Sequence, residues 1–197
     1  MNHSSIRSIT MVRHGMTEWA ATGRHTSVTD LDLNDNGRNQ AEALRRYFEA
    51  GKYRFDSVYT SPLLRARHTA MIAGFDPRVE PDLHEWYYGR YEGKTTAEIH
   101  QENPNWSIFR CGAPEGESRH DIRRRCRRLI KGWSSAGCEQ ILCFAHGHIL
   151  RSLACIWLDM NLRFGDQLRL DAASISRLGW EHNSPAIEFW NQCWSQL

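Results

Sequence analysis

The sequence predicts an α/β fold, a three-layer sandwich in which helices cover both faces of a mainly parallel central sheet. Short apolar segments that are typical of strands alternate along the chain with longer segments of helical spacing. The apolar segments are almost uninterrupted, as expected for strands that are buried on both faces. A hydrophobic fraction of 41% in 197 residues is sufficient for a core, so we expect a single domain over residues 1–197.

The first half of the chain contains two strand–helix pairs. The predicted elements are a strand at Ser8–Val12, a helix at Asn36–Ala50, a strand at Ser57–Thr60 and a helix at Leu63–Ala73. In the first helix the apolar residues recur at helical spacing, and Gly51 can end it. Pro62 stands just before the second helix, near the position where proline is favoured.

The second half continues the alternation. The predicted elements are a helix after Ser118, a strand at Gln140–Phe144, a helix from about Ile149 to Leu158, and a strand pair at Ser174–Trp180 and Ala186–Trp190. Ser118 can cap the first of these helices, because Asp121 follows three residues on. One face of that helix is apolar, with Ile122, Cys126, Leu129, Ile130 and Trp133. Its arginines are expected to point mostly elsewhere, namely Arg123, Arg124, Arg125, Arg127 and Arg128.

The segment Pro77–Glu117 differs from the rest of the chain. It is rich in Trp, Tyr, Gly and charged residues, and its hydrophobic periodicity is weak. We interpret residues 77–117 as an insertion that forms a lid over the active site.

Composition narrows the classes of function. The formal net charge is only +2, which argues against nucleic-acid binding driven by overall charge. Arg accounts for 22 of the 25 basic side chains, and its planar fork binds phosphate and carboxylate in a way that Lys cannot. The surplus of Arg therefore agrees with an anionic ligand. The alternative explanation is the base composition of the genome.

Other features concern location and metal binding. No apolar run approaches the roughly 18 residues of a membrane-spanning helix, and Ile9–Val12 is too short for the core of a signal peptide. The six cysteines form no CxxC pair and show neither a disulfide framework nor the ligand spacing of a zinc site. We therefore expect reduced thiols, a cytoplasmic location, no membrane partner and no bound metal.

Three predicted strands end in residues of the same chemical kind. Arg13–Gly15 follows the first strand, Ser61 and then Arg65 follow the second, and His146–His148 follows the third. In an open α/β sheet, ligands bind outside the carboxyl ends of the strands. We therefore expect two Arg and at least two His to converge at one edge of the sheet.

This set of side chains suits a phosphoryl group. Two Arg side chains and a protonated His146 offer roughly three positive charges to a phosphomonoester that carries nearly two negative ones. Phosphoryl transfer spreads negative charge over three equatorial oxygens, which such donors stabilise. Because His is also one of the covalent nucleophiles, the residues predict phosphoryl transfer through a phosphohistidine.

Each of these features has a simpler explanation when it is taken alone. A single Arg-His-Gly tripeptide arises by chance, and Arg65 can belong to a helix surface. His146–His148 can be part of a metal site, although no carboxylate or Cys ligand is near it in the sequence. The agreement of three strand ends is what favours the phosphoryl site.

A resemblance to a known family supports this prediction. Met11–Trp19 resembles the signature of the histidine phosphatase superfamily, which includes the cofactor-dependent phosphoglycerate mutases. Further segments resemble the motifs of that family in the same order, namely Thr26–Leu33, Ser61–Ala70, Leu83–Gly93, Gly116–Ser118 and Ala145–His148. The resemblance implies the phosphoglycerate mutase-like fold.

The resemblance also implies catalytic roles for matching residues. His14 would be the nucleophile, and Glu85 would protonate the leaving oxygen and then activate water. The phosphoryl group would be held by Arg13, Arg65 and His146. No cofactor and no metal are implied.

The residues around the acid and the substrate follow from the same resemblance. Substrate binding is expected at Thr26, Ser27, Gly147 and His148, with the backbone of the last two as a donor. We expect Glu85 to be buried among Trp86, Tyr87 and Tyr88, which favours its protonated form.

Within the superfamily, Trp106–Ser118 and the His25–Thr26 pair look most like small bacterial acid phosphatases and fungal sugar-bisphosphatases. The chain departs from the common pattern at Ala20, where mutases usually carry Asn, and at Ser27, which is usually Gly. We therefore expect a phosphatase that hydrolyses small phosphorylated metabolites, with sugar phosphates or bisphosphates as leading candidates.

Two alternatives belong to other classes. One is a cofactor-dependent phosphoglycerate mutase, which must keep water away from its phosphohistidine. The other is a non-enzymatic protein that uses Arg119–Arg128 to bind nucleic acid or an acidic partner. The near-neutral charge favours a solvated helix face and so no nucleic-acid partner. The sequence does not predict an oligomeric state.

Overall fold

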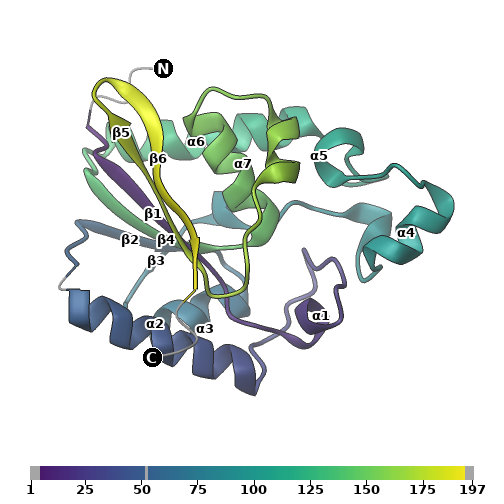
Figure 1. The fold of residues 1–197 in the computed structure, drawn as a ribbon, viewed down its shortest axis with the longest axis horizontal. Coiled ribbons are helices and arrows are strands. Elements are labelled where there is room, and N and C mark those ends of the chain that lie inside the picture. The colour runs from purple at the N-terminus through teal and green to yellow at the C-terminus, as the bar shows by residue number, and fades with distance from the viewer. Residues whose placement is uncertain (1–4, 52, 194–197) are drawn as a thin grey trace.

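A six-stranded sheet in the order β3-β2-β4-β1-β5-β6 forms the centre of the molecule (Figure 1). The computed structural model describes residues 5–51 and 53–193. The parallel strands are β1 (Ser8–Arg13), β2 (Ser57–Thr60), β3 (Arg78–Val79) and β4 (Gln140–Ala145). The antiparallel strands are β5 (Ile175–Glu181) and β6 (Ser184–Gln192). The predicted mainly parallel sheet is confirmed.

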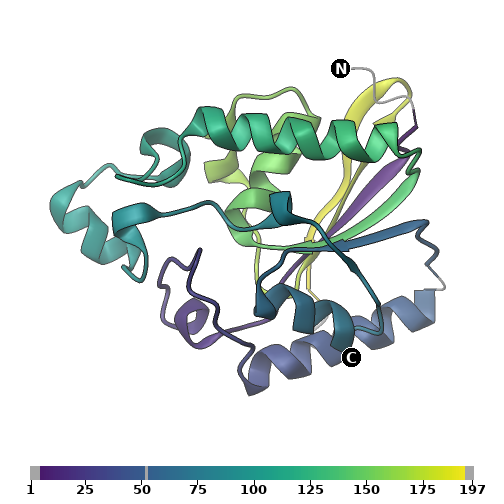
Figure 2. The same ribbon diagram turned by 180° about the vertical axis from the view of Figure 1, so that it is seen from behind.

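Helices cover both faces of this sheet, as Figures 1 and 2 show. One face carries α2 (Asp35–Gly51) and α3 (Leu64–Ile72), and the other carries α6 (Arg119–Ser135) and α7 (Gly147–Trp157). The strand β4 contributes to both cores, because successive side chains of a strand point to opposite faces. Its Ile141 and Cys143 pack with α6 and α7, whereas Leu142 and Phe144 pack with α2 and α3.

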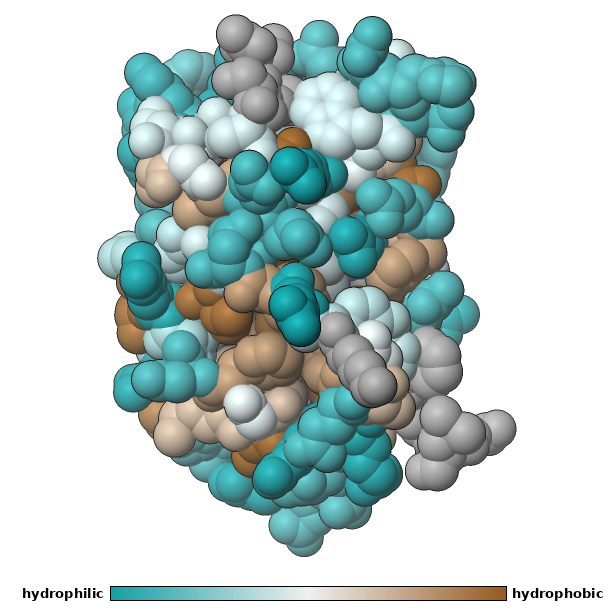
Figure 3. Space-filling view, turned by 90° about the vertical axis from the view of Figure 1, so that its left-hand side faces the viewer, coloured by the Kyte–Doolittle hydropathy of each residue, from teal (hydrophilic) through white to brown (hydrophobic). Residues whose placement is uncertain are grey.

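The core beneath α2 is closed by aromatic side chains at the end of that helix. Phe48 makes T-shaped contacts with Tyr53, Phe55 and Phe75, with ring centroids 5.7, 5.9 and 5.1 Å apart. Such edge-to-face contacts are favoured by the charge distribution of the rings. Figure 3, which views the left-hand side of Figure 1, shows apolar surface among hydrophilic residues on this side of the molecule.

The predicted helices and strands are all present, and their ends differ from the prediction by at most two residues. The capping box of α6 is formed as expected: the Ser118 hydroxyl accepts from the Asp121 N–H, and the Asp121 carboxylate accepts from the Ser118 N–H, both at 3.2 Å. The helix α7 begins at Gly147 rather than near Ile149, with His146 at its N-cap. This earlier start brings the helix N-terminus to the end of β4.

The short elements were not predicted. They are α1 (Glu18–Ala21), β3, η1 (Pro81–Leu83), η2 (Gly89–Tyr91), α4 (Thr96–Glu102), α5 (Ile108–Cys111) and η3 (Leu162–Gln167). Elements of two to seven residues are too short to show a hydrophobic period. Because β3 pairs with β2, the predicted insertion begins with a strand of the sheet itself. The helices α4 and α5 lie beyond the end of the sheet (Figure 1), and their action as a lid stays a prediction.

The cysteines and the membrane prediction can be compared with the structure. The thiols of all six cysteines are free, as expected. Within residues 5–51 and 53–193, no helix is long and apolar enough to cross a bilayer.

Parallel pairing aligns the carboxyl ends of three adjacent strands. Arg13 of β1 is paired with Ala145 of β4, and Thr60 of β2 is paired with Phe144 of β4. The bonds His14 N–H to Ala145 O and Ser61 N–H to Phe144 O, both 2.9 Å, continue these ladders by one residue. The predicted convergence of the three strand ends is thereby confirmed.

The turn after β1 packs closely against the first turn of α2. A Cβ on Gly37 would lie 2.1 Å from the carbonyl oxygen of Met16, and a Cβ on Gly15 would lie 2.5 Å from the carbonyl oxygen of Gly37. Only glycine allows this approach at either position. The N–H of Gly15 donates to Thr69 Oγ1 of α3 at 3.0 Å, which holds the turn from the other side.

The close contact between Gly37 and Met16 predicts that Gly37→Ala destabilises the protein. The added methyl must displace the turn that carries His14, so we expect the free energy of unfolding to fall by about 1–3 kcal/mol, as for other overpacked sites. Urea denaturation measures this change. Gly132→Ala is the matched control, because apart from the adjacent backbone of α6 no atom of residues 5–51 and 53–193 lies within 4 Å of its added Cβ. It should raise stability by about 0.5–1 kcal/mol. Equal stability of Gly37→Ala and the parent would contradict the contact.

Candidate active site

A cavity of about 180 Å³ lies at the carboxyl edge of the sheet. Six of the predicted site residues line it, namely Arg13, His14, Thr26, Glu85, Gly147 and His148. The other three, Arg65, His146 and Ser27, are buried behind the wall of the cavity: Arg65 binds the Thr26 carbonyl, Ser27 binds the Tyr88 N–H, and His146 binds Arg65. The structure therefore brings all nine predicted residues together but separates those that face the cavity from those that support it.

A larger cavity of about 380 Å³ lies on the other side of Arg13 and Ala20. Met16, Gln40 and Asp171 are among its lining residues, but neither His14 nor Glu85 reaches it. We assign the active site to the smaller cavity, because only that one contains a nucleophile and a carboxyl group together.

His14 is held as a neutral imidazole, with one ring nitrogen that has no hydrogen-bond partner in the described parts of the chain. Its Nδ1 lies 2.7 Å from the carbonyl oxygen of Gly15. A carbonyl can only accept, so Nδ1 carries the proton and Nε2 keeps its lone pair. Burial first, and then the positive charges of Arg65 and Arg13, lower the pKa of His14 well below its usual value. A neutral imidazole with an available Nε2 is what nucleophilic attack requires.

Arg65 and His146 form a buried pair behind His14. The rings of His14 and His146 are 5.1 Å apart, and Arg65 Nε donates to His146 Nδ1 at 3.1 Å. The Nη atoms of Arg65 donate to three carbonyl oxygens of residues 26–29. The predicted Arg65 is thus part of the core of the site rather than of a helix surface.

The expectation that His146 is protonated is wrong. A guanidinium only donates, so His146 Nδ1 must be an acceptor. The Nε2 then carries the single ring proton and donates to Ser61 Oγ at 2.7 Å. Burial first, and then the charge of Arg65, lower the pKa of His146 well below its usual value. The positive charge at this site therefore comes from arginine and not from imidazolium.

Arg13 offers a hydrogen-bond donor that nothing in the described chain uses. Its Nη1 donates to the Leu170 carbonyl at 2.6 Å, but its buried Nε has no partner among residues 5–51 and 53–193. This Nε faces the start of α7, since a Cβ on Gly147 would lie 3.6 Å from it. Buried donors are almost always satisfied, so an unused one beside a cavity is suited to an acceptor that a substrate would bring.

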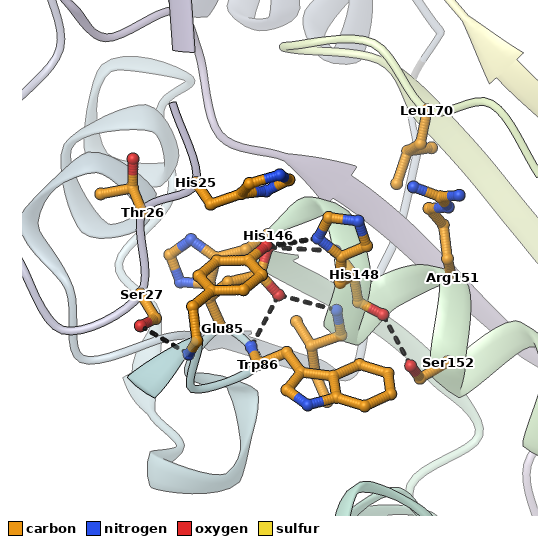
Figure 4. A network of polar contacts seen from close by, with 12 residues as sticks. His25, Thr26, Ser27, Glu85, Trp86, His146, His148, Arg151, Ser152 and Leu170 are labelled. Carbon is orange, nitrogen blue, oxygen red and sulfur yellow. Dashed lines mark hydrogen bonds and ion pairs between the residues drawn. The ribbon is translucent and has the colours of Figure 1, made fainter. Parts of the chain in front are cut away.

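Glu85 is buried at the N-terminus of α7, between that helix and its own loop (Figure 4). Its Oε1 accepts from the N–H groups of Trp86 and Ile149 at 2.8 and 2.9 Å, and its Oε2 accepts from the N–H of His148 at 3.0 Å. These three donors fix the position of the carboxyl group at the start of the helix.

Glu85 is buried as expected, and two of the three aromatic residues predicted to surround it are buried too. Trp86 and Tyr88 are buried, but Tyr87 is exposed. That these surroundings favour the protonated acid stays a prediction.

Neutral rings form the wall of the cavity beside Glu85. His148 Nδ1 is hydrogen-bonded to the Tyr88 hydroxyl and lies 3.8 Å from Glu85 Oε2. Burial first, and then the charge of Arg151, lower the pKa of His148 well below its usual value. The ring of His25 packs at a tilt of 48° against Tyr88, with centroids 4.9 Å apart, and burial lowers the pKa of His25 to about 4.

The same contacts bear on the alternative metal site at His146–His148. His146 is bound on both ring nitrogens, by Arg65 and Ser61, and His148 Nδ1 is bound to Tyr88. Among the residues that the structure describes, no group of three or more His, Cys, Asp and Glu side chains could hold a metal ion.

Ser27 does not line the cavity. Its hydroxyl donates to Glu92 and accepts from the Tyr88 N–H at 3.2 Å, and its own N–H also donates to Glu92 at 2.9 Å. It therefore joins two loops of the wall, and direct contact of Ser27 with a substrate stays a prediction.

The sequence analysis missed several residues of the cavity wall. Arg24, Tyr88 and Arg151 line it, and Arg151 is held by the Gly165 carbonyl at 2.8 Å and by the ring of Phe109 at 4.6 Å. A signal for Arg151 was present, because it is the one charged residue in the otherwise apolar segment Ile149–Leu158. For Arg24 and Tyr88 the sequence offers no comparable signal.

Comparisons with known proteins agree with this geometry. Residues 9–193 match the family model of the histidine phosphatase superfamily (branch 1). The chain belongs to this superfamily. It is accordingly a phosphatase, as the sequence predicted.

Individual relatives support the assignment. An acid phosphatase of Mycobacterium tuberculosis is 35% identical over 176 residues, which cover 87% of this chain and 86% of the relative. Sedoheptulose 1,7-bisphosphatase of Saccharomyces cerevisiae is 34% identical over 185 residues, with coverage of 78% and 68%. The solved structure of an open reading frame product from Mycobacterium tuberculosis superimposes with a TM-score of 0.89 at 32% identity, covering 95% and 98% of the two chains.

The buried neutral histidines predict that stability falls in acid. Folding lowers the pKa of His14, His146 and His148, so the unfolded chain binds more protons once the pH drops below about 6.5. Stability is fully present above that pH and decreases below it, by up to about 1.4 kcal/mol per pH unit for each histidine. Urea unfolding at pH 7.0 and 5.5 measures the slope. In His146→Asn the free energy of unfolding should depend less steeply on pH. A free energy of unfolding that is equal at the two pH values in the parent protein would contradict the prediction.

Proposed function

We propose that the protein hydrolyses small phosphomonoesters through a phosphohistidine on His14. The observation that carries the proposal is the neutral imidazole of His14, with a free Nε2, next to the unused Nε–H of Arg13 and the carboxyl group of Glu85. This combination supplies a nucleophile, a donor for a phosphoryl oxygen and a proton carrier in one cavity.

In the first step, His14 Nε2 attacks phosphorus and the bond to the leaving oxygen breaks. Glu85 donates its proton to that oxygen. His14 then carries a positive charge, which its Nδ1–H bond to the Gly15 carbonyl stabilises. Arg13 binds a phosphoryl oxygen, and Arg65, which His146 helps to hold in place behind His14, adds its positive charge. The charge that spreads over the equatorial oxygens is thereby balanced by fixed donors.

In the second step, the Glu85 carboxylate takes a proton from water, and the oxygen of that water attacks phosphorus. The P–N bond breaks, its electron pair returns to His14 Nε2, and inorganic phosphate leaves. Glu85 is protonated again and His14 is neutral, so the cycle closes without a metal or an organic cofactor. The N–H groups at the start of α7 keep the carboxylate in place in both steps.

The cavity favours substrates with a second negative group, such as sugar bisphosphates. Arg24 and Arg151 line it in addition to Arg13, whereas Glu85 is its single carboxylate within the described residues. Arg151 Nη1 has no partner in the described parts of the chain, and Figure 4 shows Arg151 beside His148 and Leu170 at the cavity wall. Similarity to a protein named sedoheptulose 1,7-bisphosphatase supports the same class.

Three finer points belong to the proposal. Residues 77–117 close over the bound substrate as a lid, supported by Tyr88 at the cavity wall. Thr26 contacts the substrate, and Gly147 and His148 do so through their backbone. The enzyme acts in the cytoplasm, where thiols stay reduced, in agreement with its six free cysteines.

The nucleophile predicts the outcome of His14→Ala. Turnover of a sugar phosphate and the acid-labile phosphoenzyme should disappear together, because both need Nε2. Phosphate release and acid-quench labelling with ³²P-substrate measure the two effects. His182→Ala, at an exposed histidine, is the control and should keep both. The assays contain EDTA, because the proposed mechanism needs no metal, and vanadate should inhibit phosphate release by the parent enzyme. Turnover by His14→Ala would refute the mechanism.

The same assays separate the alternatives. A mutase would convert 3-phosphoglycerate to 2-phosphoglycerate in the presence of 2,3-bisphosphoglycerate and release little inorganic phosphate. A non-enzymatic binder would retain DNA in a salt-dependent way even as His14→Ala. We expect phosphate release and neither of these behaviours.

The substrate class predicts a selective effect of Arg151→Met. Loss of a charged hydrogen bond to the second anionic group should lower kcat/KM for sugar bisphosphates about 10- to 100-fold. The same variant should change kcat/KM for the monophosphate of the same sugar much less. Arg163→Met, at an exposed arginine, is the matched control. Equal losses on both substrates would exclude a second anion site at Arg151.

A further inference from the structure

One arginine of α6 is buried and holds the loop that carries Glu85. The side chain of Arg125 is 4% exposed, although its neighbours Arg124, Arg127 and Arg128 are exposed. Its Nη1 donates to the carbonyl oxygens of Asp82 and His84 at 2.8 and 2.6 Å. Its Nη2 also reaches the carbonyl oxygen of Glu85, at 3.4 Å. The guanidinium therefore binds the backbone just before and at the proposed acid.

Glu117 completes this arrangement. Arg125 Nε and Nη2 donate to the two oxygens of the Glu117 carboxylate at 3.0 and 2.7 Å, which is the bidentate geometry that orients both partners. With these bonds all five N–H groups of Arg125 have acceptors. The pair is thus a rigid unit between α6 and the loop 82–87.

Glu117 in turn binds the residues that follow Glu85. Its Oε2 accepts from the Tyr87 N–H at 3.1 Å, and its backbone carbonyl accepts from Trp86 Nε1 at 2.9 Å. The Glu117 N–H donates to the Tyr87 carbonyl at 3.0 Å. A Cβ on Gly116 would lie 2.3 Å from the same carbonyl oxygen, so glycine is required for this approach. The backbone is consequently held on both sides of Glu85.

The position of this backbone decides where the Glu85 carboxylate lies. Two of its three donors, the N–H groups of His148 and Ile149, belong to α7 and not to its own loop. A shift of the loop relative to α7 would break these bonds and move the carboxyl group away from the leaving oxygen. Misplacement by about 1 Å can cost roughly 100-fold in rate. Neither Arg125 nor Glu117 is among the residues that line the cavity.

We propose that Arg125 and Glu117 are positioning residues for proton transfer, which fix the backbone on both sides of Glu85 so that its carboxyl group stays aligned with the leaving oxygen. The proposal rests on the role of Glu85 proposed above. It gives a function to the Gly116–Ser118 segment and to one of the α6 arginines.

Proton transfer offers a readout that loss of stability would not mimic. A leaving group such as p-nitrophenolate departs without a proton, whereas the alkoxide of glycerol phosphate needs one. The quotient kcat/KM reports the steps up to formation of the phosphoenzyme, so it isolates departure of the leaving group from the later hydrolysis. A purely structural role would lower kcat/KM for both substrates alike.

The test compares Arg125→Met, Arg125→Lys and Glu117→Gln with the parent on these two substrates. For Arg125→Met we expect kcat/KM for glycerol phosphate to fall about 100-fold and that for p-nitrophenyl phosphate less than about threefold. Lys keeps the charge but not the fork, so Arg125→Lys should fall between the parent and Arg125→Met. Arg127→Met, at an exposed arginine of the same helix, is the matched control and should resemble the parent.

Glu85→Gln, measured in parallel, distinguishes two kinds of failure. If Glu85→Gln shows no dependence on the leaving group, the proposed acid role is wrong and the positioning role falls with it. If Glu85→Gln shows the dependence but Arg125→Met loses activity equally on both substrates, the positioning role alone is overturned. Should Arg125→Met fail to fold, Arg125→Lys and Glu117→Gln decide, and the absence of a selective loss in both overturns the proposal.

Discussion

The parallel pairing of β4 with both β1 and β2 is the constraint on which the site depends. Through this register, residues that are more than 130 positions apart in the chain, such as Arg13 and Ala145, end their strands side by side. A slip by one residue would turn every side chain of β4 to the other face and separate its end from the ends of its neighbours. The same pairing sets the start of α7, because the helix follows β4 after one residue. The N–H groups that hold Glu85 are therefore placed by the sheet.

Buried positive charge is the second requirement of this site. Arg13 and Arg65 are desolvated, which is costly unless their N–H groups find acceptors. Backbone carbonyls supply most of these acceptors, since Arg65 binds the segment 26–29 and Arg13 binds Leu170. Burial first, and then the charges of Arg65 and Arg13, lower the pKa of His14 and keep its imidazole neutral, and the same charges attract a phosphate dianion. One arrangement of charge thus prepares both the nucleophile and the binding of its target.

The arginines of α6 show how far sequence reasoning extends. Five of the six residues 123–128 are arginines. Only one of these five, Arg125, is buried. The expectation that these arginines point away from the apolar face is wrong for Arg125, which lies three residues after Ile122 and four before Leu129 and so falls on that face. What the helical period could not reveal was the partner. The acceptors of Arg125 belong to the loop 82–85 and to Glu117, and the loop has no regular period of its own.

The sequence by itself determined the order of the longer strands and helices, the fold class and the strand ends that carry the site. These features depend on hydrophobic spacing and on capping residues, which are local properties of the chain. Only the tertiary structure decided that His146 is a neutral acceptor, that Ser27 supports the wall rather than facing the cavity, and that Glu85 meets N–H donors from α7. Protonation and orientation depend on partners that lie some 60 to 80 residues away along the chain. Local periodicity carries no information about which distant groups will meet inside the folded protein.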